Sequence, residues 1–335
     1  MKDTIAKVTE GKHLTSAEAA DAMRILLNGE ASQAQIGSFL TALRMKGETV
    51  EELFGFASVI REKAQTISPK KEPYLDLVGT GGDKTFTFNV STTSAIVAAG
   101  AGLHIAKHGN RSISSRSGAG DVLEALGVNI TAEPEVVEAC VDDAGIGFMF
   151  AQTFNKSMRF VGQARSEMGI RTVFNILGPL ANPSRAKYMM VGVYSPDLVE
   201  QIAKVMLQMG IERAFVVSGH DNMDEITTTG KTKIAEIKNG EIEVYDFSPE
   251  SYGFSIATME DLKGGDGVEN ARITRAILEG EDGPKRDIVL MNAAAALYIA
   301  GLCESIEQGI VKAKESIDSG QAMKVLDALI LLSNA

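Results

Sequence analysis

The sequence contains few cysteines and no long hydrophobic run. Its 335 residues include only two cysteines, Cys140 and Cys303, which lie far apart and lack the spacing of metal ligands. This excludes a disulfide scaffold and predicts inert core thiols in a reducing cytoplasm. The longest apolar run, Ile288 to Cys303, is interrupted by Asn292 and is shorter than the roughly 18 residues of a membrane span. We therefore expect no membrane segment, and the polar sequence after Met1 predicts no signal peptide.

Positive charge is also scarce relative to negative charge. The 33 Lys and Arg residues face 44 Asp and Glu residues, which gives a net charge of −11. Such a chain repels a nucleic-acid backbone, so we expect no nucleic-acid partner. An anionic small substrate would need a local site built from helix N-termini, a few Lys or Arg side chains, or a metal ion. The remaining composition, 44% hydrophobic and 23% charged, excludes a disordered or collagen-like chain.

Two patterns divide the chain into two expected domains. Residues 1–70 predict helices, because three capping boxes begin at Thr15, Ser32 and Thr49. The segment 68–73 predicts a linker, and residues 74–335 alternate between expected strands and helices. The expected class is therefore α/β: a small all-α domain at 1–70, with a helical contribution from about 157–185, joined to a larger α/β domain at 74–335. Its central sheet is expected to be mixed and mostly parallel.

A glycine-rich turn follows the first expected strand. The turn is Gly79-Thr80-Gly81-Gly82-Asp83, and Asn89-Val90-Ser91-Thr92 opens the next expected helix. Glycines let the backbone approach a bulky anion, and hydroxyls and free N–H groups at a helix start bind phosphate oxygens. The pattern matches neither the Walker loop nor the dinucleotide fingerprint. It favours a phosphate site, and a tight strand-to-helix turn is the alternative.

Two further clusters carry candidate ligands. Lys107-His108-Gly109-Asn110-Arg111 ends the next expected strand, and four serines follow within seven residues. Cations and hydroxyls at the carboxyl end of a strand indicate a polyphosphate site, with a solvated basic loop as the alternative. Asp224-Glu225 also follows an expected strand. Adjacent carboxylates are usually only solvated, but near a polyphosphate they are typical Mg²⁺ ligands.

Together these segments resemble the anthranilate phosphoribosyltransferase family. The resemblance covers essentially the whole chain and rests on ordered motifs at 79–83, 89–92, 107–111, 121–127, 171–183 and 224–225. It implies a helical domain joined to an α/β domain of the nucleoside phosphorylase type, and a homodimer that pairs through the helical domain. The implied enzyme is a Mg²⁺-dependent glycosyltransferase of tryptophan biosynthesis. It transfers phosphoribosyl from phosphoribosyl pyrophosphate (PRPP) to the amino group of anthranilate and releases pyrophosphate.

The same resemblance implies a role for individual residues. Lys107 and Arg165 are the expected catalytic residues, the first at the departing pyrophosphate and the second at the acceptor. The expected PRPP ligands are Gly79, Gly81, Gly82, Asp83, Thr87, Asn89, Ser91, Thr92, Lys107, Arg111 and Ser115. The expected anthranilate ligands are Gly79, His108, Asn110 and Arg165. The expected Mg²⁺ ligands are Ser91, Asp224 and Glu225.

Seven positions depart from the family pattern, and two of them, Ser218 and Asn222, stand where the family commonly has a His and a Gly. Gln152, Asn155, Lys156 and Ala164 replace a Pro, a His and two further Pro residues before or beside the expected acceptor site, and Ala119 replaces a Ser on the donor side. The acceptor-side changes leave open a phosphoribosyltransferase for a different aromatic amine. A non-catalytic, nucleic-acid-binding relative is a further alternative, against which the net charge argues.

Overall fold

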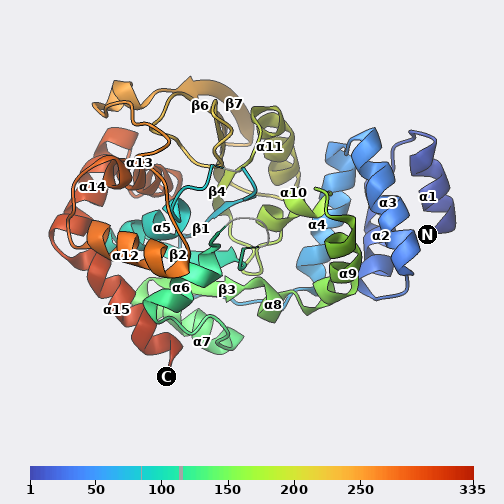
Figure 1. Ribbon diagram of the computed structural model, residues 1–335, viewed down its shortest axis with the longest axis horizontal. Coiled ribbons are helices and arrows are strands. Elements are labelled where there is room, and N and C mark those ends of the chain that lie inside the picture. The colour runs from blue at the N-terminus through green and yellow to red at the C-terminus, as the bar shows by residue number, and fades with distance from the viewer. Residues whose placement is uncertain (84, 113–115) are drawn as a thin grey trace.

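Helices alone form one end of the molecule. The computed structural model describes residues 1–83, 85–112 and 116–335. Its N-terminal helices lie together at one side of the ribbon, and the sheet with its covering helices occupies the other (Figure 1). These helices are α1 (Lys2–Thr9), α2 (Ser16–Leu27), α3 (Gln33–Lys46) and α4 (Val50–Lys63).

The three expected capping boxes are confirmed. The side chains of Thr15, Ser32 and Thr49 each accept a hydrogen bond from the backbone N–H three residues later, and the side chain there accepts one from the cap N–H. Each box satisfies two donors that the first helical turn leaves without intrahelical partners. The starts of α2, α3 and α4 are therefore determined locally by the sequence.

A buried ion pair joins the ends of three of these helices. Glu52, on α4, is fully buried and accepts hydrogen bonds from the Leu14 N–H at 2.9 Å and the Thr49 N–H at 2.8 Å. The Lys46 ammonium, at the end of α3, lies 2.8 Å from the second carboxylate oxygen of Glu52. The carboxylate thus connects the segment before α2 with the turn between α3 and α4.

A seven-stranded sheet forms the centre of the larger part. Its strands lie in the order β3-β2-β1-β4-β5-β6-β7, and the first five are mutually parallel. Strand β6 pairs antiparallel with the β5 edge, and β7 pairs antiparallel with β6. The turn between β6 and β7 is Asn239-Gly240, where both residues have positive φ, as a two-residue hairpin requires. The expected mixed, mostly parallel sheet is confirmed. The strands are β1 (Tyr74–Gly79), β2 (His104–Gly109), β3 (Ile146–Phe150), β4 (Tyr188–Gly192), β5 (Arg213–Gly219), β6 (Thr232–Lys238) and β7 (Glu241–Phe247).

Helices from distant parts of the chain cover one face of this sheet. The largest hydrophobic cluster packs strand residues such as Leu77 and Phe215 against Ile96 and Met291 of these helices. The apolar run from Ile288 lies mostly in α13 and is buried, as expected. The covering helices are α5 (Val90–Gly100), α6 (Ala119–Leu126), α12 (Gly267–Leu278), α13 (Pro284–Ile299), α14 (Ile306–Asp318) and α15 (Gln321–Ser333).

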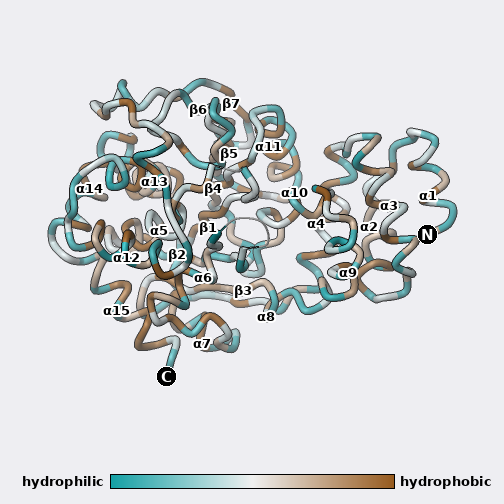
Figure 2. The backbone as a smooth tube through the Cα atoms, viewed as in Figure 1, coloured by the Kyte–Doolittle hydropathy of each residue, from teal (hydrophilic) through white to brown (hydrophobic). Residues whose placement is uncertain are grey.

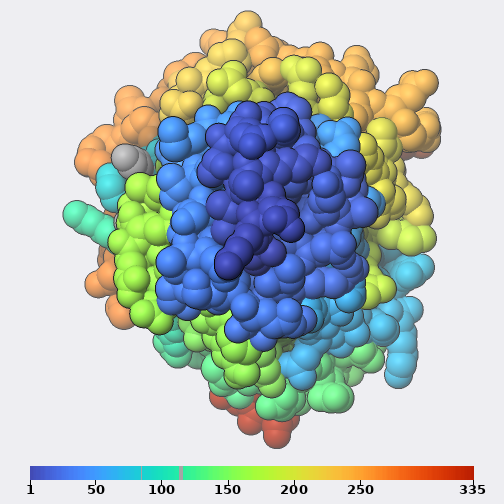
Figure 3. All heavy atoms as spheres, turned by 90° about the vertical axis from the view of Figure 1, so that its right-hand side faces the viewer, coloured from blue at the N-terminus to red at the C-terminus, as the bar shows by residue number. Residues whose placement is uncertain are grey.

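The opposite face packs against the helical end of the molecule. One continuous hydrophobic cluster joins Phe39 and Phe56 of the N-terminal helices to Val161, Val191 and Val205. Helices α9 (Arg159–Met168) and α10 (Phe174–Leu180) pack on α2, α3 and α4, and α11 (Val199–Gln208) packs between α4 and strands β5 and β6. Figure 3, which faces this end, shows atoms of residues near 160 beside those of the N-terminal helices. Two further short α-helices are α7 (Pro134–Ala139) and α8 (Ala151–Phe154).

The helices show the polarity of a packed protein. In Figure 2 the N-terminal helices each carry both hydrophobic and hydrophilic residues, as expected of helices with one buried side. Throughout residues 1–83, 85–112 and 116–335, no helix combines the length and hydropathy needed to cross a membrane. Cys140 and Cys303 are both buried as free thiols, and burial raises the pKa of both.

The Glu52 ion pair gives a direct test of stability. We expect Glu52→Ala to lower the free energy of unfolding by about 3–5 kcal/mol, because it leaves the buried Lys46 ammonium without its partner. Urea unfolding followed by far-ultraviolet circular dichroism measures this loss. Glu51→Ala, which changes the exposed neighbouring carboxylate, is the matched control, and it should cost no more than about 0.5 kcal/mol. Equal losses in the two variants would refute the assigned importance of the pair.

Candidate active site

A cavity of about 770 Å³ opens at the carboxyl ends of the parallel strands. Its walls come from the glycine-rich turn after β1, the segment after β2, helices α8 to α10, and the loop after β5. Ligands of open α/β sheets bind at this end, because loops from neighbouring parallel strands converge there. The cavity therefore brings together segments that lie as far apart in sequence as residues 79 and 225.

Close backbone packing holds the loop after β5 against the glycine-rich turn. A Cβ atom at Gly79 would overlap the Asp224 carboxylate, and one at Gly192 would overlap the Asp224 carbonyl oxygen. The Asp224 carboxylate accepts a hydrogen bond from the Gly81 N–H at 2.6 Å. Gly81 and Gly82 both have positive φ, at 64° and 72°, which glycine adopts without steric cost. The turn and the carboxylate are thus placed by glycines that no other residue can replace without movement.

Three carboxylates concentrate negative charge at this corner. Burial and the neighbouring Asp83 raise the pKa of Asp224 to about 7. Burial and the Asp224 carboxylate raise the pKa of Glu225 well above its ordinary value. One Glu225 oxygen accepts a hydrogen bond from the Ser91 N–H, at 3.1 Å, at the start of α5. Like charges held this close are stabilised by a cation that lies among them.

The oxygen donors at this corner suit Mg²⁺, which takes part of its ligands from water and substrate, better than they suit a metal ion bound by protein side chains alone. In the described part of the chain, no three His, Cys, Asp or Glu side chains converge as a complete metal-ligand set. Mg²⁺ commonly takes one or two carboxylates and completes its shell with water and substrate phosphates. The carboxylates of Asp224 and Glu225 and the Ser91 hydroxyl supply hard oxygen donors of this kind.

Lys107 crosses from β2 toward the same corner. Its side chain is buried, and its ammonium donates hydrogen bonds to the Leu77 carbonyl and, at 3.2 Å, to the Ser91 hydroxyl. Burial lowers the pKa of Lys107 below its ordinary value, although the carboxylates of Asp76, Glu225 and Asp224 oppose that shift. An anionic ligand in the cavity would favour the charged ammonium further.

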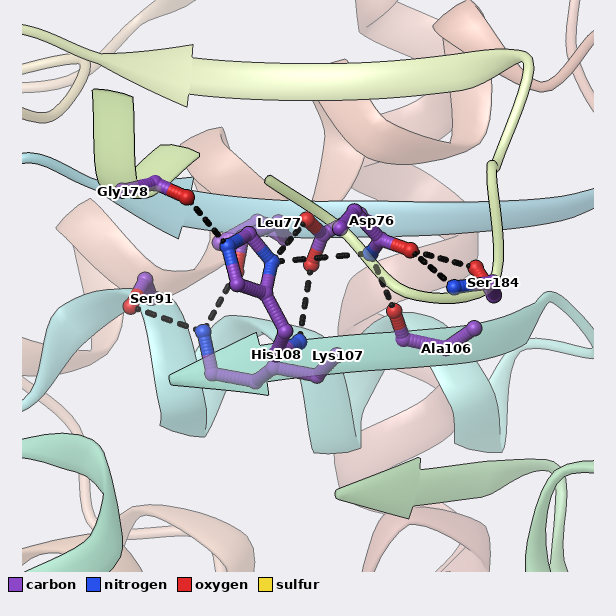
Figure 4. A network of polar contacts seen from close by, with 9 residues as sticks. Asp76, Leu77, Ser91, Ala106, Lys107, His108, Gly178 and Ser184 are labelled. Atoms are coloured by element: carbon purple, nitrogen blue, oxygen red, sulfur yellow. Dashed lines mark hydrogen bonds and ion pairs between the residues drawn. The ribbon is translucent and has the colours of Figure 1, made fainter. Parts of the chain in front are cut away.

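His108 connects two neighbouring strands with helix α10 (Figure 4). Its Nδ1 lies 2.6 Å from the buried Asp76 carboxylate of β1, and its Nε2 lies 2.7 Å from the Gly178 carbonyl. Both partners are acceptors, so both ring nitrogens must donate, which only the imidazolium does. Burial lowers the pKa of His108, but Asp76 and the Gly178 carbonyl outweigh burial, and the pKa is raised. His108 thus holds the helix that forms the far wall of the cavity.

Asn89 is oriented by a residue that sequence reasoning missed. Its amide oxygen accepts hydrogen bonds from Asn270 Nδ2 at 2.8 Å and from the Ser117 hydroxyl at 3.1 Å. The buried Asn270, on α12, uses its own oxygen to accept the Gly265 N–H at 2.8 Å. With both oxygens engaged, the Asn89 amide presents its N–H₂ group as a donor. No local sequence signal marks Asn270, whereas Asp76 could have been noticed as a charge within an apolar strand.

The far wall of the cavity is cationic and partly apolar. The Arg165 guanidinium, on α9, lies 5.0 Å from the Phe174 ring centre, and burial lowers its pKa. Among the described residues, no carboxylate forms an ion pair with Arg165, Lys156 or Arg159, all of which line the cavity. A half-buried cation without a counter-ion provides a site for an anionic group, and the Phe174 ring adds a surface for an aromatic one.

Most of the expected site residues converge on this cavity. Those that line it are Gly79, Gly81, Gly82, Asp83, Thr87, Asn89, Ser91, Lys107, His108, Asn110, Arg111, Arg165, Asp224 and Glu225. Thr92 does not line it, because the helical turn of α5 directs its hydroxyl into the interior. Arg111 lies at the rim with its guanidinium paired to Glu124 at 2.7 Å and Asp121 at 3.2 Å. Ser115 lies outside the described residues.

Five of the positions that depart from the family pattern also fall on or near the cavity, most of them on the acceptor side. Gln152, Asn155 and Lys156 line the cavity, as does Ala119 on the donor side, whereas Ala164 is a buried residue of α9 that does not line the cavity. Asn155 is only 6% exposed, and its amide oxygen has no hydrogen-bond partner within the described ranges. Four of these five positions therefore contribute directly to the surface of the cavity.

Comparison with known proteins covers both parts of the chain. The family model described as glycosyl transferase family, a/b domain, matches residues 71–323, and the helical bundle domain of the same family matches residues 2–64. A relative named anthranilate phosphoribosyltransferase, from Acetivibrio thermocellus, is 53% identical over 335 residues, which cover 100% of this chain and 97% of the relative.

Solved structures agree with the sequence comparison. The crystal structure of anthranilate phosphoribosyltransferase from Thermus thermophilus has a TM-score of 0.94 and 40% identity, covering 99% of this chain and 100% of that one. The enzyme of the same name from Saccharomyces cerevisiae, in complex with PRPP and Mg, has a TM-score of 0.90 and 31% identity, covering 100% and 99%.

The His108 imidazolium predicts a pH dependence of stability. Because its pKa is raised in the folded protein, its contribution is fully present below the unfolded value of about 6.5 and is lost as pH rises through the folded value. We expect His108→Gln to lower the free energy of unfolding by about 3 kcal/mol or more at pH 6, since it removes the cation that is hydrogen-bonded to the buried Asp76 carboxylate.

That loss should shrink steadily as the pH is raised above neutrality. Urea unfolding of both proteins between pH 6 and pH 10 measures the difference. His220→Gln is the matched control, since His220 is half exposed and its pairing with Asp246 lies at the surface. A difference between wild type and His108→Gln that stays constant over this range would contradict the charged state assigned to His108.

Proposed function

The chain belongs to the anthranilate phosphoribosyltransferase family, and from that premise we propose how its own residues divide the work of the reaction. The enzyme transfers the phosphoribosyl group of PRPP to the amino group of anthranilate, with Mg²⁺, in tryptophan biosynthesis. The products are N-(5-phosphoribosyl)anthranilate and pyrophosphate. One observation carries the division of roles: a single cavity joins a phosphate-binding turn and a carboxylate pair to the guanidinium of Arg165.

The donor half is the side formed by the glycine-rich turn and the start of α5. The backbone N–H groups of Gly82 and Asp83, the Asn89 amide and the Ser91 hydroxyl bind the phosphates of PRPP. Gly81, whose N–H is donated to Asp224, lets the backbone of the turn approach the ligand closely. Thr87 and Arg111 extend this surface toward the rim, and Ser115 stays a proposed ligand. Thr92 is not a ligand, because its side chain is fully buried away from the cavity. Phosphate binding at such a turn uses N–H groups that the helix start leaves unpaired.

The metal site lies in the same half. Asp224, Glu225 and the Ser91 hydroxyl would hold Mg²⁺. When bound, the ion would supply positive charge to offset that of the pyrophosphate. The raised pKa values of both carboxylates support this assignment, because a divalent cation offsets the repulsion that raises them.

The acceptor half is the wall formed by α8, α9 and α10. Arg165 binds the anthranilate carboxylate, and the Phe174 ring beside it contacts the aromatic ring. Asn110 and the Gly79 backbone lie between the two halves and align the acceptor nitrogen with the anomeric carbon. His108 uses both ring nitrogens within the protein, so we propose that it shapes this half by fixing α10.

Catalysis then depends on position and electrostatics. Pyrophosphate leaves the anomeric carbon through an oxocarbenium-like transition state. Lys107 stabilises the negative charge that develops on the departing pyrophosphate. The amino group of anthranilate is neutral and nucleophilic, and the proton that it loses after attack passes to water. No strong general base is therefore needed, in keeping with a cavity in which His108 is held as an imidazolium.

We also propose the domain boundaries, the oligomeric state and the cellular location of the enzyme. The helical unit ends near residue 70 with a contribution from about 157–185, and the α/β unit runs from 74 to 335; the family models at 2–64 and 71–323 support this division. A homodimer through the helical unit is supported by the Met45 side chain, which is 83% exposed at the end of α3. Two buried free thiols support a cytoplasmic location.

The activity is tested by the fluorescence of anthranilate. Purified protein with PRPP, Mg²⁺ and anthranilate should consume the fluorescence, and omission of PRPP or addition of EDTA should abolish the change. The substitutions Gln152 and Asn155 are then compatible with anthranilate as the acceptor. Binding of PRPP by calorimetry without loss of fluorescence would instead reject anthranilate and direct the search to other aromatic amines.

The division of roles predicts different kinetic effects for two variants. Arg165→Ala should raise the KM for anthranilate by about 10- to 100-fold, since it removes a charged hydrogen-bond partner worth about 1.5–3 kcal/mol. Lys107→Ala should lower kcat by about 10²-fold or more with a smaller effect on that KM. Steady-state kinetics at saturating PRPP separate these outcomes, and equal changes of both constants in both variants would contradict the assignment.

A further inference from the structure

Two consecutive glycines at the tip of the glycine-rich turn need support from outside the turn. Gly81 and Gly82 both occupy the left-handed region of φ and carry no side chain to pack, so the backbone of the turn has more conformational freedom than one built from residues with side chains. Asp224 fixes the Gly81 N–H. The carbonyl of Gly82 is held by a different residue, Arg171, on the other side.

Arg171 reaches the turn from the helical side of the cavity. It lies between α9 and α10, six residues after Arg165, and its Nη2 donates a hydrogen bond to the Gly82 carbonyl. Its guanidinium carbon lies 4.1 Å from the centre of the Tyr194 ring, a stacking distance that fixes the plane of the fork. Its own carbonyl accepts a hydrogen bond of 2.9 Å from Arg44 of α3.

Tyr194 is in turn fixed to the base of the same turn. Its N–H donates to the Thr80 hydroxyl at 3.1 Å, and the Thr80 N–H donates to the Gly192 carbonyl at 2.9 Å. Arg171 therefore joins the tip of the turn to the end of β4 and, through Arg44, to the helical bundle. Neither Arg171 nor Tyr194 lines the cavity, so their effect on a ligand must pass through the turn.

We propose that Arg171 is a positioning residue that holds the glycine-rich turn in its PRPP-binding conformation and links it to the acceptor wall. This rests on the proposed function. Because Arg165 and Arg171 belong to one continuous segment, a shift of the acceptor wall moves the support of the turn. The N–H groups that receive the phosphates are thereby oriented by a residue that does not touch them, and a displacement of about 1 Å at such groups costs up to about 100-fold.

The test compares Mg²⁺–PRPP binding in Arg171 variants by calorimetry without acceptor. Arg171→Ala should weaken binding by about 10- to 100-fold while the KM for anthranilate, at saturating PRPP, changes less than about twofold. Arg171→Lys keeps the charge and loses the planar fork, so it should recover only a small part of the affinity. Arg24→Ala, which removes an exposed arginine of α2, controls for the change of net charge and should bind as wild type does.

Tyr194 provides a second, independent pair of variants. Tyr194→Phe keeps the ring under the guanidinium and should bind Mg²⁺–PRPP as wild type does, whereas Tyr194→Leu should reproduce part of the loss seen in Arg171→Ala. The two losses should not add in the double variant, since both act on one support. Thermal melting of each variant excludes unfolding as the cause, and the Tyr194 pair carries the test if Arg171→Ala does not fold.

The possible results distinguish failure of the positioning role of Arg171 from failure of the proposed function. Unchanged PRPP affinity in Arg171→Ala, or full recovery in Arg171→Lys, would overturn the positioning role, the second because it would show that charge alone matters. A loss in Arg171→Ala that appears equally in the KM for anthranilate would point to general loss of structure and also overturn it. Failure of the wild-type protein to bind Mg²⁺–PRPP would reject the proposed function itself.

Discussion

The architecture of the site depends on one close approach between backbones. The loop that carries Asp224 packs directly on Gly79 and Gly192, at the carboxyl ends of the adjacent strands β1 and β4. Because neither strand end has a side chain, the carboxylate reaches the Gly81 N–H and Glu225 reaches the Ser91 N–H. The same contact therefore places the acidic corner, the glycine-rich turn and the start of α5 in one position relative to the sheet.

The opposite wall depends on a buried charge pair. The Asp76 carboxylate on β1 and the imidazolium of His108 on β2 together hold the Gly178 carbonyl of α10. Removing charges from water costs free energy that their attraction only partly returns, so a buried pair of this kind is best understood as fixing geometry. Here it fixes the distance between the sheet, which carries the donor half, and the helices that carry the acceptor half.

Charge is distributed unevenly between these two walls. The protein has a net charge of −11, yet both substrates of the reaction are anions. The acidic corner receives its ligand through a divalent cation and backbone N–H groups, whereas the acceptor wall presents Arg165, with which no carboxylate of the described residues is paired. Arg171 bridges the two, since it contacts Gly82 of one wall and belongs to the segment of the other. The local arrangement, and not the overall charge, thus decides what the cavity attracts.

What the sequence determined by itself is local. The capping boxes at Thr15, Ser32 and Thr49, the turn at Asn239-Gly240 and the left-handed glycines follow from interactions within a few residues, and the strand–helix alternation placed the ligand-bearing segments at one edge of the sheet. The tertiary structure alone decided the partners of those segments. Asp76 meets His108 across 32 residues, Gly82 meets Arg171 across 89, and Asn89 meets Asn270 across 181. Spacing along the chain carries no information about such pairs, because they form only when the sheet and the helical bundle pack. The same packing turned the Thr92 hydroxyl inward while its neighbour Ser91 faces the cavity, a difference that the helical period of α5 and its burial against the sheet decide together.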